Sequence, residues 1–367
     1  MRILYFTRAN SVHDQRFMNA IVEAGHEGYA LHLYKGEWPV PKGITRMEWE
    51  GVDGSLAIKD LAEVTLRLRA LLKGLAPDLV QAGPLHDVAY LVALSGFKPL
   101  LATSWGFDLM KDVDSNLLYR MTARYSLEKS ERLIVDAKCS AERAVRFGFD
   151  PLRIDRFPWG VDLSRFSPEL ASQAGSAWRQ EQGWQNKKVL LCLRAWEPNY
   201  GVDVLAKAFC RAARQDRDLR LLLMGDGSQS KEIRTILHDG GAEEQVFYGG
   251  RVPNDDLPRY YGAADLYVSP SHVDGSSVSL MEAMACGLPS LVSDIPANLE
   301  WVVPGHSGLI FPDGDAKALE RSIFDAFQVD LTALGRQARL HSLEFADWEK
   351  NREVLWNSYV QTLAKRK

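Results

Sequence analysis

Cysteine is scarce in this chain, and the four that occur lie far apart. Cys139, Cys192, Cys210 and Cys286 include no pair separated by only two residues. A zinc ribbon or a disulfide framework requires sets of cysteines at close, regular spacing, so neither is expected. We therefore expect four free, buried thiols in a protein of a reducing compartment.

An excess of one charge is also absent. The 367 residues include 44 Lys and Arg against 48 Asp and Glu, a formal net charge of −4. A dedicated nucleic-acid binder shows a basic excess, so we expect no nucleic-acid partner. The content of 46% hydrophobic and 25% charged residues is typical of a globular protein, and the length predicts two domains.

Long apolar runs are missing as well. The longest uncharged stretches, residues 88–97 and 301–312, are much shorter than the roughly 20 residues that span a bilayer. Residues 2–7 are too short for the core of a signal peptide and predict a first strand instead. We expect a cytoplasmic protein, with weak peripheral membrane contact through its N-terminal domain as an open alternative.

Short apolar runs alternate with helical periodicity through most of the chain. The expected strands, with helices between them, are residues 2–7, 28–34, 78–81, 99–103, 132–136, 188–193, 219–224, 245–248 and 265–268. Repeated strand–helix units with nearly continuous apolar strands predict parallel sheets covered on both faces.

The segment 158–187 interrupts this alternation and is the best candidate for a domain boundary. We therefore expect an α/β protein of two Rossmann-like domains, residues 1–165 and 176–346, which face each other across a cleft. Ligands of such folds bind at the carboxyl ends of the parallel strands.

The most informative stretch is residues 265–294, DLYVSPSHVDGSSVSLMEAMACGLPSLVSD. An expected strand ends in the small-residue loop 274–277, and a helix follows. A helix N-terminus presents unpaired backbone N–H groups and a positive dipole end, which suit a diphosphate. Asp274 can accept hydrogen bonds from sugar hydroxyls, and Glu282 can do the same for a ribose. An ordinary N-cap at Ser276 or Ser277, with Glu282 as a surface carboxylate, explains the spacing equally well.

The spacing of Asp274 and Glu282, with AMACGLP directly after Glu282, resembles the Glu-x7-Glu signature of the retaining family-4 glycosyltransferases (glycosyl transferases group 1). This family has the GT-B fold. Further stretches that resemble this family in order and spacing are FPWGVDLSRFSP (157–168), LRAWEPNYGVDVLAKAF (193–209), LLLMGDG (221–227), FYGGRVPNDDLPRYYGAADLYVSPS (247–271) and PGHSGLIFPDGD (304–315). The resemblance covers most of residues 100–345. It implies an N-terminal acceptor-binding domain, a C-terminal nucleotide-sugar-binding domain, and a C-terminal helix (347–367) that crosses back to the first domain.

The resemblance also implies a donor site with Asp274, Arg194 and Glu282 as its catalytic residues. Arg194 would contact the diphosphate, Asp274 the donor sugar and Glu282 the ribose. The further donor-binding residues that it implies are Tyr200, Gly225, Gly250, Arg251, Gly275, Ser276, Ser277 and Val278.

Two groups of residues are candidates for the acceptor side. Trp105 and Asp108 match a family loop that usually reads His-Gly-x-Asp. His13, Asp14 and Arg16 belong to the polar stretch 8–16 after the first strand, which is expected to be a loop. A solvated loop without a ligand is the alternative for that stretch.

Four positions depart from the family pattern. Asp274 stands where the family has Glu, Tyr200 where it has a phosphate-binding Lys, Trp105 where it has His, and Trp159 where it has Asn. Because tyrosine carries no positive charge, one expected cation is missing, and Arg251 is a candidate to replace it.

We therefore expect a retaining glycosyltransferase of the hexosyltransferase type. It would move a sugar from a UDP- or GDP-linked donor to a hydroxyl of a glycan, a lipid-linked or a small-molecule acceptor, in glycan, cell-surface polysaccharide or glycolipid synthesis. A nucleotide-sugar epimerase and a non-catalytic sugar-nucleotide-binding protein are the alternatives.

Neither a metal nor a cofactor besides the donor is expected. The carboxylate pair Asp112 and Asp114 is better explained as a helix cap, and Asp313 with Asp315 as a turn. His86, Asp87 and His272 are weaker candidates for a general base.

Overall fold

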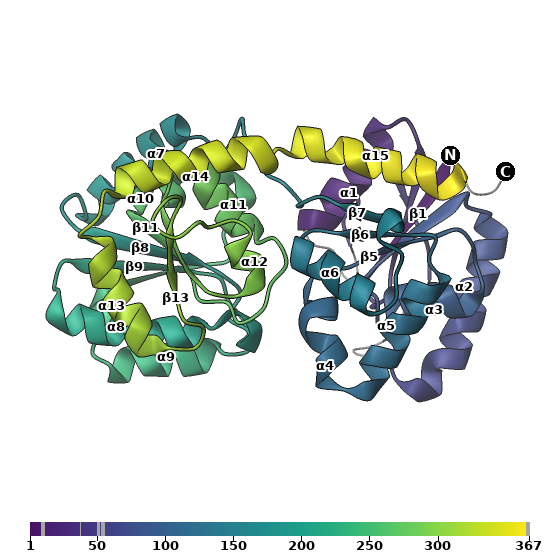
Figure 1. Cartoon of the computed structure of the whole chain (residues 1–367), viewed down its shortest axis with the longest axis horizontal. Helices are drawn as coiled ribbons and strands as arrows, with labels where there is room; N and C mark the ends of the chain where they lie inside the picture. Colours follow the sequence, from purple (N-terminus) through teal and green to yellow (C-terminus); the bar gives the residue numbers. More distant parts are fainter. Residues whose placement is uncertain (9–11, 37, 50–51, 53–55, 365–367) are drawn as a thin grey trace. The chain divides into compact units, whose positions relative to one another are not determined.

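The computed structural model describes residues 1–364 except residues 9–11, 37, 50–51 and 53–55 (Figure 1). Part of the expected polar loop 8–16 therefore lies outside the described residues. The chain divides into two compact units. Unit 1 comprises Met1–Trp159 and Glu349–Lys367, and unit 2 comprises Gly160–Trp348.

Unit 1 contains a seven-stranded parallel sheet in the order β3-β2-β1-β4-β5-β6-β7. Its strands are β1 (Arg2–Thr7), β2 (Glu27–His32), β3 (Ile44–Arg46), β4 (Leu79–Ala82), β5 (Leu100–Thr103), β6 (Arg132–Val135) and β7 (Ile154–Arg156). Every residue of β4, β5 and β6 is buried, as expected for the centre of a parallel sheet covered on both faces.

Helices cover both faces of this sheet. Those of unit 1 are α1 (Val12–Glu23), α2 (Leu61–Leu75), α3 (Val88–Ser95), α4 (Val113–Ser115), α5 (Leu117–Lys129) and α6 (Lys138–Arg146), with short turns η1 (Ile58–Asp60), η2 (Asp108–Asp112) and η3 (Pro151–Arg153). The main apolar cluster joins α2, α3 and α5 to one face of the sheet.

The last helix, α15 (Trp348–Ala364), packs on unit 1 beside α1. The Trp356 indole N–H donates to the Ala20 carbonyl oxygen at 2.7 Å, and the Tyr359 hydroxyl donates to Gln81 Oε1 at 2.8 Å. The end of the chain thus completes the layer on the second face of the first sheet.

Unit 2 contains a six-stranded parallel sheet in the order β10-β9-β8-β11-β12-β13. Its strands are β8 (Lys188–Leu193), β9 (Leu219–Met224), β10 (Val246–Gly250), β11 (Leu266–Ser269), β12 (Ser290–Ser293) and β13 (Leu309–Phe311).

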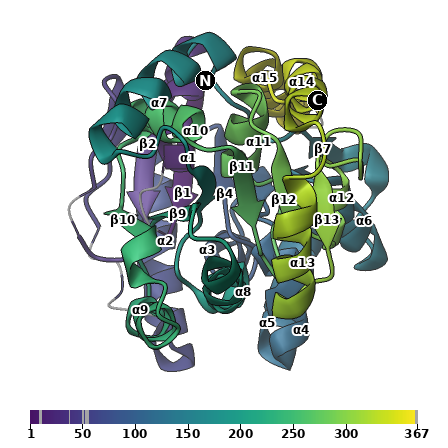
Figure 2. The same ribbon diagram turned by 90° about the vertical axis from the view of Figure 1, so that its left-hand side faces the viewer.

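Two layers of helices sandwich this second sheet (Figure 2). The helices of unit 2 are α7 (Pro168–Gln182), α8 (Val202–Gln215), α9 (Ser230–Asp239), α10 (Leu257–Ala263), α11 (Val278–Ala285), α12 (Pro296–Leu299), α13 (Ala316–Ala326) and α14 (Leu331–Phe345), with short turns η4 (Pro198–Tyr200), η5 (Glu243–Gln245) and η6 (Asn254–Asp256). Along β8, Leu190 and Cys192 join the cluster with α8, α9 and α13, whereas Val189 and Leu191 join the cluster with α7, α10, α11 and α14. Successive side chains of the strand thus enter opposite cores.

The expected α/β class with two parallel sheets is confirmed, but several local expectations are wrong. Residues 13, 14 and 16 lie on helix α1, not in a loop, because α1 begins at Val12. Asp112 makes no side-chain capping bond. Instead of capping a helix, the Asp114 carboxylate accepts hydrogen bonds from Arg120 and Arg143.

All four cysteines are free, as the spacing predicted, and Cys139 is only partly buried. Within the described residues, no helix combines the length and the apolar character that crossing a bilayer requires.

Candidate functional site

The carboxyl ends of β8 and β11 lie where the strand order of unit 2 reverses. The strands β9 and β10 follow β8 on one side, whereas β11 pairs with the other edge of β8. A crevice forms at such a switch point because the connections on its two sides leave on opposite faces of the sheet. Arg194 follows β8 directly, and the loop 270–277 follows β11.

Arg194 and Asp274 form a buried ion pair at this point. Arg194 Nη2 donates to Asp274 Oδ2 at 2.6 Å, and the arginine side chain is only 8% exposed. Arg194 Nη1 donates to the Ser277 hydroxyl at 2.6 Å and to the Ser279 hydroxyl at 3.3 Å. The planar guanidinium is therefore held in one orientation between a carboxylate and the start of α11.

The surroundings keep Arg194 charged. Burial disfavours the cation most strongly, but the Asp274 carboxylate together with Tyr267 and Tyr200 outweighs burial and raises the pKa of Arg194. Burial raises the pKa of Asp274, while the attraction of Arg194 acts in the opposite direction. Removing either partner would leave a buried charge without compensation.

Ser277 caps helix α11 and also contacts Arg194. Its hydroxyl accepts a hydrogen bond from the Leu280 N–H at 3.4 Å, so it is the N-cap of α11. The same hydroxyl accepts from Arg194. The N-terminal N–H groups of a helix have no partner within the helix, so α11 directs a positive dipole end toward the guanidinium.

The neighbouring loop residues are held from within unit 2. The backbone N–H of Gly275 donates to Asp274 Oδ1 at 3.0 Å, and the Trp301 indole donates to the Ser276 hydroxyl at 3.1 Å. The loop 274–277 is thus tied to both Asp274 and the core before α11 begins at Val278.

Glu282 is buried, so its interpretation as a surface carboxylate is wrong. Its side chain accepts a hydrogen bond from the Tyr261 hydroxyl at 2.8 Å and one from the Asn254 amide at 3.3 Å. These two donors from α10 and η6 fix the orientation of the carboxylate.

Tyr200 supports the arginine instead of supplying a second cation. The guanidinium carbon of Arg194 lies 4.2 Å from the centroid of the Tyr200 ring. An aromatic face attracts a cation through its quadrupole and also restricts the position of the guanidinium. The sequence showed the loss of the family's Lys, but not this stacking.

Two glycine turns complete the edge of the sheet. Gly225 has φ +100°, and a Cβ there would lie 2.3 Å from the Arg194 carbonyl oxygen, so no side chain fits. Its N–H donates to the Gly250 carbonyl at 2.6 Å, which brings the ends of β9 and β10 together. Arg251 is exposed beside them and interacts electrostatically with Asp226.

A second polar cluster lies at the switch point of unit 1, between β1 and β4. Arg8 follows β1, and His86 and Asp87 follow β4. Arg8 donates to the Asp87 carboxylate and contacts His86 Nε2. Asp112 Oδ2 lies 3.5 Å from the same His86 nitrogen. No local pattern joins Arg8 to this cluster, because 78 residues separate it from His86.

His86 is neutral at physiological pH. Burial lowers its pKa to about 3, and the positive charge of Arg8 acts in the same direction. Its ring packs on Tyr119 at 4.5 Å between centroids. His272 of unit 2, the other histidine considered as a base, pairs with Asp313 at 2.6 Å.

The residues expected on the acceptor side have internal partners. Asp14 is buried and accepts a hydrogen bond from the Tyr5 hydroxyl at 2.8 Å. Arg16 Nη1 donates to the Trp159 carbonyl at 2.7 Å. The His13 ring lies 6.0 Å from the Trp105 ring, so these two candidates are neighbours.

Asp108, another residue expected on the acceptor side, is fully buried. Its carboxylate accepts hydrogen bonds from the Ser104 hydroxyl at 2.5 Å and from the N–H groups of Leu85 and Leu109, each at 2.9 Å. Burial raises its pKa to about 6 in spite of these donors. The hydrogen bonds give Asp108 a clear role in holding the loop after β5.

Among the residues that the structure describes, no group of three or more His, Cys, Asp or Glu side chains is arranged to hold a metal ion. The charged side chains described above for the unit 2 site are Arg194, Asp274 and Glu282, with Arg251 at its edge.

Two family models match the chain. Residues 176–337 match the model of glycosyl transferases group 1, and residues 2–137 match the model of glycosyl transferase 4-like proteins.

Two curated relatives illustrate the similarity. The GDP-mannose-dependent alpha-(1-6)-phosphatidylinositol monomannoside mannosyltransferase of Mycolicibacterium smegmatis is 26% identical over 204 residues, 53% of this chain and 53% of the relative. The D-inositol 3-phosphate glycosyltransferase of Pseudarthrobacter chlorophenolicus is 29% identical over 242 residues, 64% of this chain and 56% of the relative. The match thus spans little more than half the length of either relative.

Two solved structures share the fold over nearly the whole chain. Anabaena HepE in complex with UDP-glucose has a TM-score of 0.79 at 17% identity, with 98% of this chain and 99% of that chain covered. Sucrose-phosphate synthase from Thermosynechococcus elongatus has a TM-score of 0.80 at 18% identity, with 100% of both chains covered.

Proposed function

Since the chain belongs to the glycosyltransferase family that these two models describe, we propose that it transfers a sugar from a nucleotide-diphosphate sugar to an acceptor hydroxyl, with retention at the anomeric carbon. The observation that carries this proposal is the convergence of Arg194, Asp274 and the N-terminus of α11 at the switch point of unit 2. We assign the diphosphate to Arg194 and α11, the donor sugar to Asp274, and the ribose to Glu282.

Charge separation explains why this arrangement suits the reaction. As the bond between the sugar and the diphosphate breaks, positive charge develops on the sugar ring and negative charge on the leaving diphosphate. Arg194 and the dipole of α11 stabilise the negative charge, and their orientation is fixed before the reaction begins. The Asp274 carboxylate, held by Arg194, lies beside them to stabilise the positive ring.

No protein nucleophile is assigned in this step. The acceptor hydroxyl attacks the anomeric carbon from the face that the diphosphate leaves, and a phosphate oxygen of the leaving group takes the hydroxyl proton. The new glycosidic bond therefore keeps the configuration of the donor. Burial lowers the pKa of His86 to about 3, so its ring is a weak proton acceptor, as expected for a reaction that needs no histidine base.

We assign acceptor binding to unit 1, through the Arg8, Asp87 and Asp112 cluster and the surface at His13 and Trp105. Sugar and polyol hydroxyls can donate hydrogen bonds to carboxylates and accept hydrogen bonds from a guanidinium group. Curated relatives named for inositol phosphate and phosphatidylinositol mannoside substrates support an acceptor of this kind. A UDP- or GDP-linked donor is supported by the UDP-glucose complex of the structural neighbour and by the GDP-mannose-dependent relative.

The direct test incubates the protein with a panel of UDP- and GDP-sugars, with and without inositol phosphate and sugar acceptors. Nuclear magnetic resonance then identifies the product and its anomeric configuration. Transfer with retention supports the proposal. Isomerised donor, inverted product or binding without any turnover would contradict it.

Replacing Asp274 by asparagine is expected to lower turnover about 10- to 100-fold, because a charged hydrogen bond contributes roughly 1.5–3 kcal/mol. Affinity for free nucleoside diphosphate should change much less, since Asp274 is assigned to the sugar. Steady-state rates and calorimetric titration measure the two effects. Asp294→Asn, at the exposed end of β12, is the matched control. Equal losses in rate and affinity would show that Asp274 only shapes the loop.

Transfer is expected to persist in excess EDTA. The charge of the diphosphate is assigned to Arg194 and α11, with Arg251 nearby, whereas a metal-dependent site places paired carboxylates beside the phosphates. The measurement is the transfer rate in EDTA and after Mg²⁺ or Mn²⁺ is added back. Activity that disappears with EDTA and returns with metal would overturn this assignment.

A further inference from the structure

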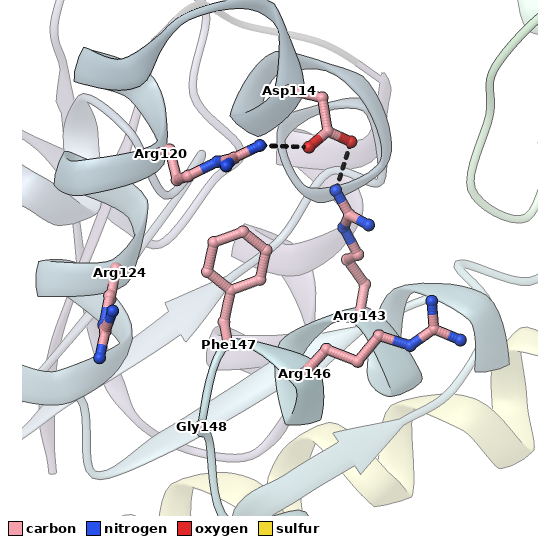
Figure 3. A pocket seen from close by; sticks show the side chains of 7 residues that line it. All are labelled: Asp114, Arg120, Arg124, Arg143, Arg146, Phe147 and Gly148. Carbon is pink, nitrogen blue, oxygen red and sulfur yellow. Dashed lines mark hydrogen bonds and ion pairs between the residues drawn. The ribbon is translucent and has the colours of Figure 1, made fainter.

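Unit 1 contains a hollow lined by arginines, whose lining residues differ from those of the polar cluster at its switch point. The hollow lies among α4, α5 and α6 and has a volume of about 500 Å³ (Figure 3). The residues that line it are Asp114, Arg120, Arg124, Arg143, Arg146, Phe147 and Gly148. We refer to it as the arginine pocket.

The arginine pocket has an excess of positive charge, with four guanidinium groups against one carboxylate. Asp114 Oδ1 accepts from Arg120 Nη2 at 2.8 Å, and Oδ2 accepts from Arg143 (Figure 3). Within the described part of the chain, Arg124 and Arg146 form no ion pair or hydrogen bond. One carboxylate, that of Asp114, is therefore shared by two arginines, while Arg124 interacts electrostatically with Glu128 on its own helix and lies on the other side of Phe147 from Arg146 (Figure 3).

Helix electrostatics explain only half of this cluster. Arg143 and Arg146 lie in the last turn of α6, where the negative end of the helix dipole favours cations. Arg120 lies near the N-terminus of α5, where a cation is unfavourable, and Arg124 lies one turn further along. In addition, Arg143 Nε is buried without a hydrogen-bond partner. Arg124 is stabilised by Glu128 one turn further along α5, whereas the position of Arg120 is not favoured by the helix dipole.

We propose that the arginine pocket binds a phosphate group, carried either by a soluble phosphomonoester or by a phospholipid headgroup. Guanidinium groups bind phosphate oxygens through pairs of charge-assisted hydrogen bonds. Arg143 stacks over the Phe147 ring at 5.6 Å, which gives the pocket a rigid wall. A volume of about 500 Å³ accommodates a phosphate together with an attached glycerol or sugar.

The two sources of the phosphate differ in what they would do to the surface beside the pocket. Leu117, Leu118 and Met121 on α5 are 70%, 45% and 61% exposed. A phospholipid whose headgroup occupies the pocket would bring these apolar side chains into contact with the membrane. A soluble phosphomonoester would leave them in water.

The test measures binding of glycerol 3-phosphate by calorimetry and binding of sedimented phosphatidylcholine vesicles with and without phosphatidic acid. We expect Arg124→Ala/Arg146→Ala to weaken phosphate-dependent binding at least about tenfold, because each charge-assisted hydrogen bond is strong. Both arginines are exposed, so the fold should persist. Arg67→Ala, an exposed arginine on α2, is the matched control.

Each outcome decides the proposal. Arginine-dependent binding of glycerol 3-phosphate alone supports a soluble phosphomonoester. Arginine-dependent binding of phosphatidic acid vesicles that is also reduced by Leu117→Ser/Met121→Ser supports a headgroup. Binding of neither probe, or equal binding by the double variant and the wild type, would overturn the proposal. The outcome is independent of transfer activity, so it stands apart from the proposed function.

Discussion

Arg194→Ala is expected to reduce sugar transfer by about 10²–10³-fold, the typical effect of removing a preorganised donor that stabilises developing negative charge. Affinity for nucleoside diphosphate should fall as well, because the same guanidinium is assigned to the diphosphate before and after bond cleavage. The measurements are steady-state transfer rates and calorimetric titration with UDP and GDP.

Loss of folding would imitate this result, because Arg194→Ala leaves Asp274 buried without its partner. Arg194→Lys keeps a positive charge but cannot donate to Asp274 and Ser277 in the same plane, so it should fold and still transfer poorly. Arg214→Ala, on the exposed side of α8, is the control for a general loss of charge. Wild-type affinity and turnover in Arg194→Lys and Arg194→Ala would show that the diphosphate binds elsewhere.

Acid is expected to destabilise the protein through three histidines of unit 1. Burial lowers the pKa values of His13, His32 and His86 to about 3, 4 and 3, respectively. The unfolded chain takes up a proton on each near pH 6.5, whereas the folded chain does not. Their contribution to stability is therefore complete above pH 6.5 and is lost as the pH falls toward the folded pKa values.

His32→Phe isolates one of these contributions. The His32 ring stacks on Trp38 at 5.2 Å, and its Nε2 is buried without a hydrogen-bond partner, so phenylalanine can replace the ring. Between pH 7 and 5, the variant should lose about 2 kcal/mol less unfolding free energy than the wild type, at about 1.4 kcal/mol per pH unit. Urea unfolding at both pH values measures the difference.

The exposed His238 provides the control with the opposite sign. A hydrogen bond that the protonated ring donates to the Glu243 carboxylate raises its pKa, so its contribution is present at low pH and is lost as the pH rises. His238→Gln should therefore not reduce the acid sensitivity. Equal pH dependence in His32→Phe and the wild type would contradict the assignment of a neutral, buried His32.

The sequence predicted the strands whose residues are mostly apolar and long enough to show a pattern. The edge strands β3, β7 and β13 have three residues each, too few to distinguish a strand from a loop. The buried strand β12 was also missed, because its four residues begin and end with serine. The start of α1 was missed because its regular apolar positions begin only at Phe17, one turn after the helix starts. A polar first turn gives no hydrophobic periodicity.

The candidate donor site was predicted as a set of residues, but not as a set of contacts. Asp274 and Glu282 stand on one loop–helix segment, so their spacing is visible in the sequence. Arg194 and Asp274 are 80 residues apart, and only the parallel pairing of β8 and β11 brings them together. The stacking of Tyr200 on Arg194 likewise depends on η4, whose position no local pattern determines.

The central claim is that Arg194 and the start of α11 bind the diphosphate of the donor. The most direct measurement is a crystal structure of the protein with UDP or GDP, whichever raises its melting temperature more. We predict the two phosphates within hydrogen-bond distance of Arg194 and the backbone N–H groups that begin α11. Phosphates bound in unit 1, or at another edge of the unit 2 sheet, would contradict the claim.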